Sequence, residues 1–194
     1  MLYNLVLFFH IFGVVTMFVA VGITLTAMIG MLHAKKVESL RVWSSLAVKI
    51  DGLLPLSVIF ILVPGLYLVI STWGWKTAWV NLSLVMLIVM TFMGPAINLR
   101  KLKGIAEAIN SETDSIPSIY LQGKVRNKVL WTSVLIMTML TIAILFLMVV
   151  KPAVNGAFLT IIVSILLGVI TAGLILRSSA NPSISKKSSS SVNI

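Results

Sequence analysis

The chain has 194 residues, of which 59% are hydrophobic and only 10% are charged, and its formal net charge is +10. A soluble domain carries roughly a quarter charged residues, so this composition in so small a globule would leave large apolar patches in water. A lipid bilayer resolves that excess. Cysteine is absent, which excludes disulfides, thiolate metal sites and cysteine nucleophiles.

Five apolar runs follow one another along the chain, each close to the roughly 20 residues that cross a bilayer core. They cover about 5–32, 53–70, 78–99, 129–150 and 157–176. Pro55 falls in the first turn of the second run, where proline is tolerated, whereas Pro64-Gly65 is expected to kink that helix. We predict an all-α fold, a polytopic membrane bundle over 1–177, followed by a disordered cytoplasmic tail over 178–194.

The basic residues are distributed asymmetrically between the loops. Thirteen of the fifteen fall between runs one and two, between runs three and four, or in the tail: Lys35, Lys36, Arg41, Lys49, Arg100, Lys101, Lys103, Lys124, Arg126, Lys128, Arg177, Lys186 and Lys187. The other two loops hold only Lys76 and Lys151. Because basic loops mark the cytoplasmic side, the N-terminus is expected outside and the C-terminus in the cytoplasm of a multi-pass cell-membrane protein. This asymmetry explains the positive charge without nucleic acid.

The start of the chain lacks the basic segment of a signal peptide, because no Lys or Arg precedes Lys35. Aromatic residues gather near the ends of the runs, as in the interfacial belts of membrane proteins. Those near the outer ends are Tyr3, Trp73, Trp75 and Trp79, and those near the inner ends are Trp43, Tyr120 and Trp131. The tryptophan trio could instead stack a quinone or a sugar.

Two basic stretches show the spacing of amphipathic helices. The third run is expected to continue through Leu102, Ile105 and Ile109 to about Asn110. A second such helix, which contains Val37, Leu40, Trp43 and Ala47, is expected to lie along the lipid headgroups. Either stretch could bind anionic lipid or a partner, or act only as a positive-inside anchor.

Small residues recur every four positions in two of the runs, a pattern that lets helix backbones approach closely. They are Thr16, Ala20 and Thr24 in the first run, and Thr160, Ser164, Gly168 and Ala172 in the fifth. We expect these seams to hold the bundle of one chain together, and a homodimer through the fifth helix is the alternative.

Ionisable residues are almost absent from the five runs. Asp51 comes closest, and we expect it at the cytoplasmic entrance of the second helix, where a carboxylate suits the positive helix end. Without ionisable groups near the midplane, ion-coupled transport is disfavoured. Phosphate loops, zinc motifs and Ser-His-Asp sets are also missing, so no catalytic residue is expected and no catalytic machinery is visible.

His10 is the exception inside the first run. An imidazole about 9 Å below the helix end is costly unless it is hydrogen-bonded or ligates something. One hypothesis is a hydrogen bond across helices, with Tyr67, Asn81, Ser83 or Thr160 as the partner. Another is axial ligation of haem b, for which Gly13, one turn away, would leave room for a flat ring. A pH-sensing or substrate-contacting role is the remaining alternative.

A second haem ligand is harder to find. His33, the only other histidine, follows His10 by roughly 35 Å along the same helix, too far to bind the same iron. Met86 and Met148 lie at a suitable depth, and a thioether ligates haem iron in some cytochromes. Methionines in an apolar chain are more often packing residues, so both interpretations stay open.

Three short motifs carry a family resemblance. Leu7-Phe8-Phe9-His10-Ile11-Phe12-Gly13, Pro64-Gly65-Leu66-Tyr67 and the stretch from Trp79 to Asn98-Leu99-Arg100 resemble a bacterial family of uncharacterised integral membrane proteins. That family in turn resembles the membrane domain of copper-resistance D proteins and the membrane-bound protoporphyrinogen oxidase. The resemblance implies a compact helical bundle associated with haem or copper. Of the site residues, it carries over only His10, as a candidate ligand.

Three functions follow as expectations. The first is a small accessory or structural membrane protein that handles lipid or assists a membrane partner. The second is a haem- or copper-associated redox protein that uses His10. The third is a small-solute channel or transporter, which a broken helix at Pro64-Gly65 or a water-filled path would favour.

Overall fold

The computed structural model describes residues 1–178, and every regular element in that part is helical. The elements are α1 (Leu2–His33), α2 (Val37–Asp51), α3 (Leu54–Leu68), η1 (Val69–Trp73), α4 (Ala78–Met93), η2 (Gly94–Leu99), α5 (Arg100–Asn110), α6 (Ile119–Val125), α7 (Lys128–Val150) and α8 (Val154–Ser178), where η marks a π-helical turn. Five segments are long and apolar enough to cross a membrane, as predicted: Leu2–His33, Val37–Trp73, Ala78–Asn110, Ile119–Val150 and Val154–Ser178. The predicted tail, apart from Ser178 at the end of α8, lies outside the described residues.

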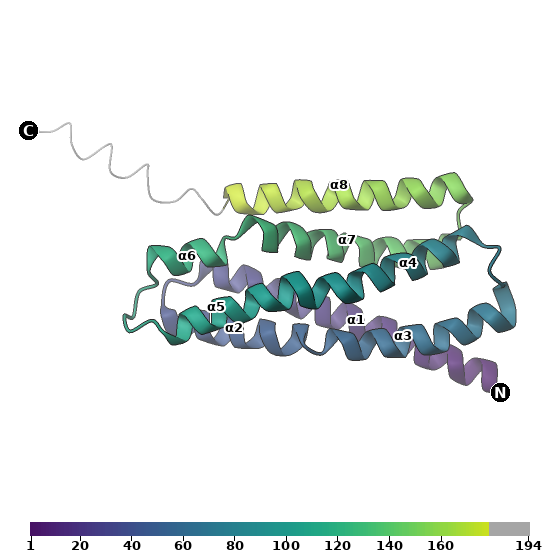
Figure 1. Ribbon diagram of the computed structural model, residues 1–194, viewed down its shortest axis with the longest axis horizontal. Helices are drawn as coiled ribbons and strands as arrows, with labels where there is room; N and C mark the ends of the chain where they lie inside the picture. The colour runs from purple at the N-terminus through teal and green to yellow at the C-terminus, as the bar shows by residue number, and fades with distance from the viewer. Residues whose placement is uncertain (179–194) are drawn as a thin grey trace, which may run out of the picture.

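The helices run roughly along one axis, so the molecule has two ends (Figure 1). The tryptophan end comprises residues 1–4, 69–78 and 149–155, and it carries the N-terminus. The basic end comprises residues 34–53, 100–128 and 177–178. All basic residues of the described part except Lys76 and Lys151 lie in these basic-end segments.

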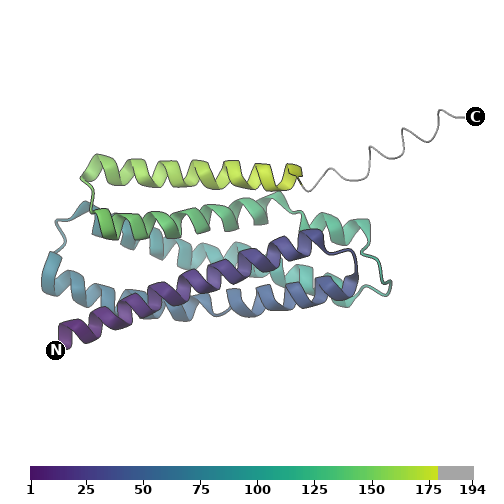
Figure 2. The same ribbon diagram turned by 180° about the vertical axis from the view of Figure 1, so that it is seen from behind.

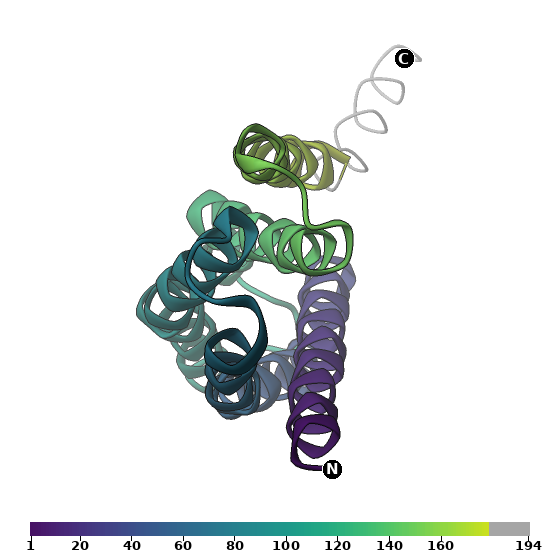
Figure 3. The same cartoon turned by 90° about the vertical axis from the view of Figure 1, so that its right-hand side faces the viewer.

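The helices form two layers. α1 packs against α2 and α3, and α7 packs against α4 and α8, whereas α3 touches α4 and α1 touches α7 only lightly. Seen along the axis, α1, α3, α4 and α7 surround the centre of the bundle, and α8 lies outside them beside α7 (Figure 3). The layers are joined more closely at the basic end, where α2 packs on α5.

The second membrane-length segment is a broken helix. Its two halves, α2 and α3, lie nearly end to end (Figure 2), and the break falls at Gly52-Leu53. Pro55, which has no N–H, stands in the first turn of α3. The amphipathic helix predicted around Val37 and Leu40 is therefore present. It packs along α1 and α5 as part of the bundle. The break also differs from the one considered at Pro64, since α3 continues through that proline.

The third segment also changes its winding. It is α-helical to Met93, π-helical from Gly94 to Leu99, and α-helical again until Asn110. Pro95 cannot donate a backbone hydrogen bond, and a π turn is one way for a helix to absorb that loss. The predicted amphipathic continuation, α5, is confirmed with its predicted end at Asn110. Its apolar face is buried through Leu102, Ile105 and Ile109.

The short helix α6 was not anticipated from the sequence, and it explains one wrong expectation. Ser118 caps it by accepting a hydrogen bond from the Leu121 backbone N–H at 3.3 Å. Trp131, expected in an aromatic belt, is fully buried in the basic-end core. Its indole N–H donates to the Val125 carbonyl at 2.9 Å. A buried indole needs such a partner, and α6 supplies it.

Glycines permit two helix crossings at which the backbones approach closely. A Cβ on Gly13 would lie 2.8 Å from the Phe60 carbonyl carbon of α3, and one on Gly168 would lie 2.6 Å from Ile136 Cα of α7. Ser164 and Ala172 of the predicted α8 seam are buried in the same way. The expectation that this seam packs within one chain is confirmed, and α7 covers the face proposed for a homodimer. On α1 the buried line runs through Gly13, Ala20 and Thr24, with Thr16 exposed.

Candidate ligand cavity

His10 is tied to the neighbouring helix by a hydrogen bond. Its Nδ1 lies 2.9 Å from the carbonyl oxygen of Ile61 on α3. Because a carbonyl can only accept, Nδ1 carries the proton and donates. The predicted cross-helix bond is therefore present, with a backbone partner in place of the four side chains considered. Nε2 has no hydrogen-bond partner among residues 1–178 and, in the neutral ring, keeps a lone pair.

The imidazole borders a cavity of about 370 Å³ between the two layers, near the tryptophan end. This volume is within the range of roughly 300–1,000 Å³ that is usual for small-molecule sites. The walls come from α1, α3, η1, α4 and α7 and are almost wholly apolar, for example Val14, Leu62 and Leu84. The cavity lies where α3 and α4, and α1 and α7, make few contacts.

Two further polar groups reach the same cavity. Ser83 on α4 is 1% exposed, and its hydroxyl has no hydrogen-bond partner in the described part of the chain. Lys151, at the tryptophan end of α7, also lines the cavity. The lysine Nζ lies 5.2 Å from the ring centroid of Trp73 and 5.5 Å from that of Trp79. These distances are typical of cation–π contacts.

The tryptophans thus have a more specific place than an interfacial belt. Trp73 and Trp79 meet edge to face at a centroid distance of 5.3 Å. Trp79 is buried at 7% exposure, whereas Trp75 is half exposed. Because Lys151 adopts a left-handed backbone conformation, with φ of 52°, at the end of α7, the chain turns there toward α8. The ring pair and the ammonium group lie together at this end of the cavity.

The residues expected to hold haem are only partly brought together. Met148 lines the cavity with His10, and Met86 is not among the lining residues. Gly13 makes its close approach to the backbone of α3, so that face has no room for a flat ring. Gly65 is the glycine beside the imidazole, since a Cβ there would lie 3.2 Å from Nδ1. The cavity therefore offers one imidazole ligand with a thioether sulfur nearby, but the face of Gly13 has no space for a haem macrocycle.

His33 has the surface position expected for it. Its Nδ1 donates to the Ile29 carbonyl of the same helix at 2.9 Å, and its side chain is exposed. Within residues 1–178 the structure places no cluster of three or more His, Asp or Glu side chains that could hold a metal.

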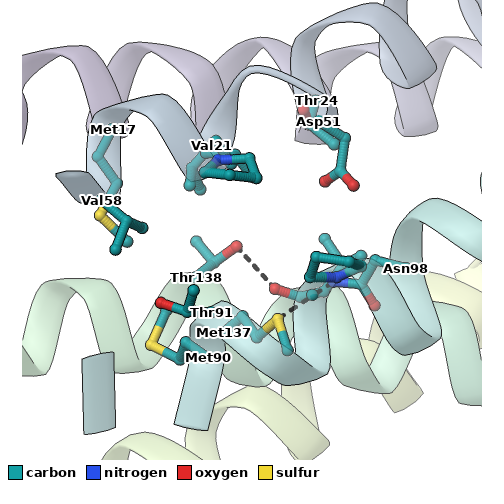
Figure 4. Close-up of a pocket in the computed structure, with 15 residues that line it drawn as sticks. Met17, Val21, Thr24, Asp51, Val58, Met90, Thr91, Asn98, Met137 and Thr138 are labelled. Carbon is teal, nitrogen blue, oxygen red and sulfur yellow. Dashed lines mark hydrogen bonds between the residues drawn. The ribbon is translucent and has the colours of Figure 1, made fainter. Parts of the chain in front are cut away.

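The expectation for Asp51 is wrong. It is the last residue of α2, it does not cap the next helix, and it is only 6% exposed. Its carboxylate points into a smaller pocket, of about 70 Å³, inside the bundle (Figure 4). Asp51 follows Ala47 by four residues and therefore shares the buried face of α2. That spacing was the available signal. The absence of ionisable groups from the interior, expected from the sequence, does not hold at this residue.

No protein-family model, curated protein or solved structure matches the chain.

Proposed function

We propose that the chain is a multi-pass cell-membrane protein of accessory type that binds an amphipathic, anionic ligand in the cavity beside His10. The observation that carries this proposal is the composition of the cavity wall. It is apolar over almost its whole area, and Lys151 lines it at its tryptophan end, with Nζ 5.2 Å from the ring centroid of Trp73. A suitable ligand has an apolar body, which packs against these walls, and an acidic group, which lies near Lys151. A fatty acid or an acidic phospholipid has this chemistry.

The polar groups inside the cavity add specificity. In the tautomer set by the Ile61 carbonyl, Nε2 of His10 accepts a hydrogen bond, and the Ser83 hydroxyl is free to donate or accept. A ligand that carries a hydroxyl group along its apolar body would satisfy both. Leaving these groups unpaired in an apolar site is costly. A hydroxyl-bearing lipid is therefore favoured over a plain alkyl chain.

The route to the cavity follows from the two-layer packing. Because α3 and α4 touch lightly, as do α1 and α7, the ligand would enter sideways from the bilayer. We propose that the basic end faces the cytoplasm, on the distribution of Lys and Arg. Lys151 and the cavity would then lie toward the outer leaflet.

Native mass spectrometry of the protein purified in mild detergent tests the proposal. We expect a lipid-sized adduct at a stoichiometry near one, which is lost when Leu84→Trp fills the cavity. Val85→Trp is the matched control, because Val85 is the next residue of α4 and is exposed at 50%. An adduct that survives Leu84→Trp, or that both variants lose equally, would contradict the proposal.

A metal-associated role is a second candidate, and a specific observation favours it. Metal-binding histidines commonly donate one ring N–H to a backbone carbonyl and ligate through the other nitrogen. His10 has this arrangement with Ile61, and Met148 lines the same cavity. An imidazole and a thioether suit Cu(I), and the same pair ligates haem in some cytochromes.

An absorption spectrum and elemental analysis of the same preparation test this candidate. If His10 is a ligand, copper should be present near one equivalent in the wild type and in His33→Ala, and should be lost in His10→Ala. A colourless, metal-free protein from haem- and copper-sufficient cells would remove this candidate. It would leave the lipid proposal standing.

A further inference from the structure

A second pocket lies deeper in the bundle, where the two irregular helices face each other. It is lined by Leu54 and Pro55, just after the break between α2 and α3, and by Gly94 and Pro95 of the π turn η2. The α7 residues that line it, such as Val134 and Thr138, lie roughly 9–15 Å along that helix from its first residue. The pocket therefore falls within the membrane-length part of α7.

Three oxygen-bearing side chains line this pocket without a hydrogen-bond or ion-pair partner for the oxygen in the described part of the chain. The Asp51 carboxylate points into it from the end of α2, and Asn98 lies on the opposite side (Figure 4). Asn98 is 4% exposed, and its Oδ1 is unpartnered, while its amide nitrogen donates to Met137 Sδ at 3.2 Å. Thr24 of α1 is 3% exposed, and its Oγ1 is also unpartnered.

The free hydroxyl of Thr24 contrasts with the other helical threonines around it. Thr91 and Thr138, which line the same pocket, donate to carbonyls one turn back at 2.7 and 2.8 Å. That local bond is the ordinary way for a threonine to satisfy its hydroxyl in an apolar helix. Thr24 does not make it. An unpartnered buried hydroxyl beside an unpaired carboxylate is costly unless something in the pocket binds both.

The charge of the pocket selects the occupant. Asp51 is its only acidic residue, and no Lys, Arg or His lines it. An unpaired buried carboxylate is strongly unfavourable. Asp51 also stands at the C-terminal end of α2, where the helix dipole is negative and favours a cation. Ends of broken membrane helices are where Na⁺ and H⁺ bind in many transporters. The volume of about 70 Å³ is too small for an organic ligand.

We propose that Asp51, Asn98 and Thr24 form a binding site for a monovalent cation, with Na⁺ as the fitting probe. All three donors are oxygen atoms, the ligands that hard cations take. One carboxylate balances one positive charge, so a divalent ion would leave an excess charge in the interior. The cation would join α1, the end of α2 and η2, and would thereby hold the two broken segments in register. This proposal does not rest on the lipid-binding function.

The test measures ²²Na⁺ binding and thermal unfolding of the full chain in detergent, with NaCl exchanged for choline chloride at constant ionic strength. We expect saturable binding near one equivalent and a rise of roughly 5 °C in Tm at Na⁺ far above Kd. Asp51→Asn should abolish both effects, and Thr24→Val should weaken binding by tenfold or more. Glu38→Gln, which removes an exposed carboxylate from the same helix, should change neither.

Several results would overturn the proposal. They are the absence of ²²Na⁺ binding to the wild type, a Na⁺ response that persists in both Asp51→Asn and Thr24→Val, and a response to Ca²⁺ or Mg²⁺ alone. Stabilisation by acid without any by Na⁺ would assign the pocket to a proton and would also overturn it. If Asp51→Asn does not fold, Thr24→Val decides the matter, because it removes one hydroxyl and leaves the carboxylate in place.

Discussion

At the scale of single residues, the two ring nitrogens of His10 differ. Nδ1 joins α1 to α3 through the Ile61 carbonyl, whereas Nε2 has no partner in the described part of the chain and is the atom that we propose meets a ligand. The bond to Ile61 explains why sequence reasoning reached the correct kind of interaction but not its partner. Polar side chains can be named from a sequence. A backbone carbonyl becomes an acceptor only through the way in which two helices cross.

His10→Ala should therefore lower stability even when no ligand is bound. Cross-helix hydrogen bonds in membranes contribute roughly 0.6 kcal/mol on average and up to about 2, and the lost ring adds a void. We expect a loss of about 1–2 kcal/mol in the free energy of unfolding, measured by steric trapping or by denaturation in mixed micelles. His33→Ala is the control, because His33 bonds only within its own helix. Equal stability of the two variants would show that the Ile61 bond contributes nothing.

The buried Asp51 shows that the charge of a single residue does not predict its exposure. Its charge suggested a solvated helix end, and the neighbouring Lys49 and Gly52 supported that view. The pattern of α2 indicates the opposite, because Leu40, Ser44, Ala47 and Asp51 share one buried face. The general preference for exposed charge led to the wrong prediction, and the helical period was the better guide. Ser83 was considered only as a hydrogen-bond partner of His10, and Lys151 gave no comparable signal, since their approach to the cavity depends on the packing of α4 and α7 against α1 and α3.

At the scale of elements, glycines decide how closely the helices pack. Gly13→Ala and Gly168→Ala should each destabilise the bundle, because the new methyl group would meet backbone atoms within 3 Å. Overpacking of this kind costs about 1–3 kcal/mol. Gly22→Ala on α1 and Gly173→Ala on α8 are matched controls with no atom within 4 Å of the new carbon. They should be neutral or stabilising, since alanine favours a helix by up to about 1 kcal/mol.

Thermal unfolding of the four glycine variants gives the comparison directly. We expect a lower Tm for Gly13→Ala and Gly168→Ala than for Gly22→Ala and Gly173→Ala. If the first pair has the higher Tm, or if the two pairs do not differ, the helix crossings are not as close as described. Each of the five predicted apolar runs falls within one of the observed membrane-length segments, because an apolar run that crosses lipid satisfies its backbone as a helix. The second, third and fourth segments are longer than the predicted runs, since α2, α5 and α6 extend them at the basic end. The break at Gly52-Leu53 and the π turn at Gly94 depend on backbone hydrogen bonds near Pro55 and Pro95, which lack an N–H. Hydropathy carries no information about these bonds.

At the scale of the whole molecule, the absence of cysteine makes orientation simple to measure. Lys76→Cys reports on the tryptophan end, and Lys103→Cys reports on the basic end. In intact cells a membrane-impermeant maleimide should label only the first variant, and both should react after permeabilisation. The reason is the positive-inside rule applied to the asymmetric loops. Labelling of Lys103→Cys in intact cells would reverse the proposed orientation, and the cavity would then face the inner leaflet.

The two ends of the bundle differ in how they are packed. The basic end has a core in which the side chains of Trp131 and Leu130 are completely buried. The tryptophan end holds the apolar cavity beside His10, between layers that touch only lightly. Regions with few packed contacts open most readily, so we expect ligand exchange at the tryptophan end without disturbance of the basic end.

Photolabelling of the protein in membranes with a fatty acid that carries a diazirine on its chain tests the ligand site in the cavity directly. We expect labelled peptides from the cavity wall, around Leu84 on α4 and Met148 on α7. Leu84→Trp should abolish the labelling, and Lys151→Gln should weaken it. Labelling that follows only the outward, lipid-facing surface, with Phe92 on α4 marked as strongly as Leu84 and no response to Leu84→Trp, would contradict a ligand site in this cavity.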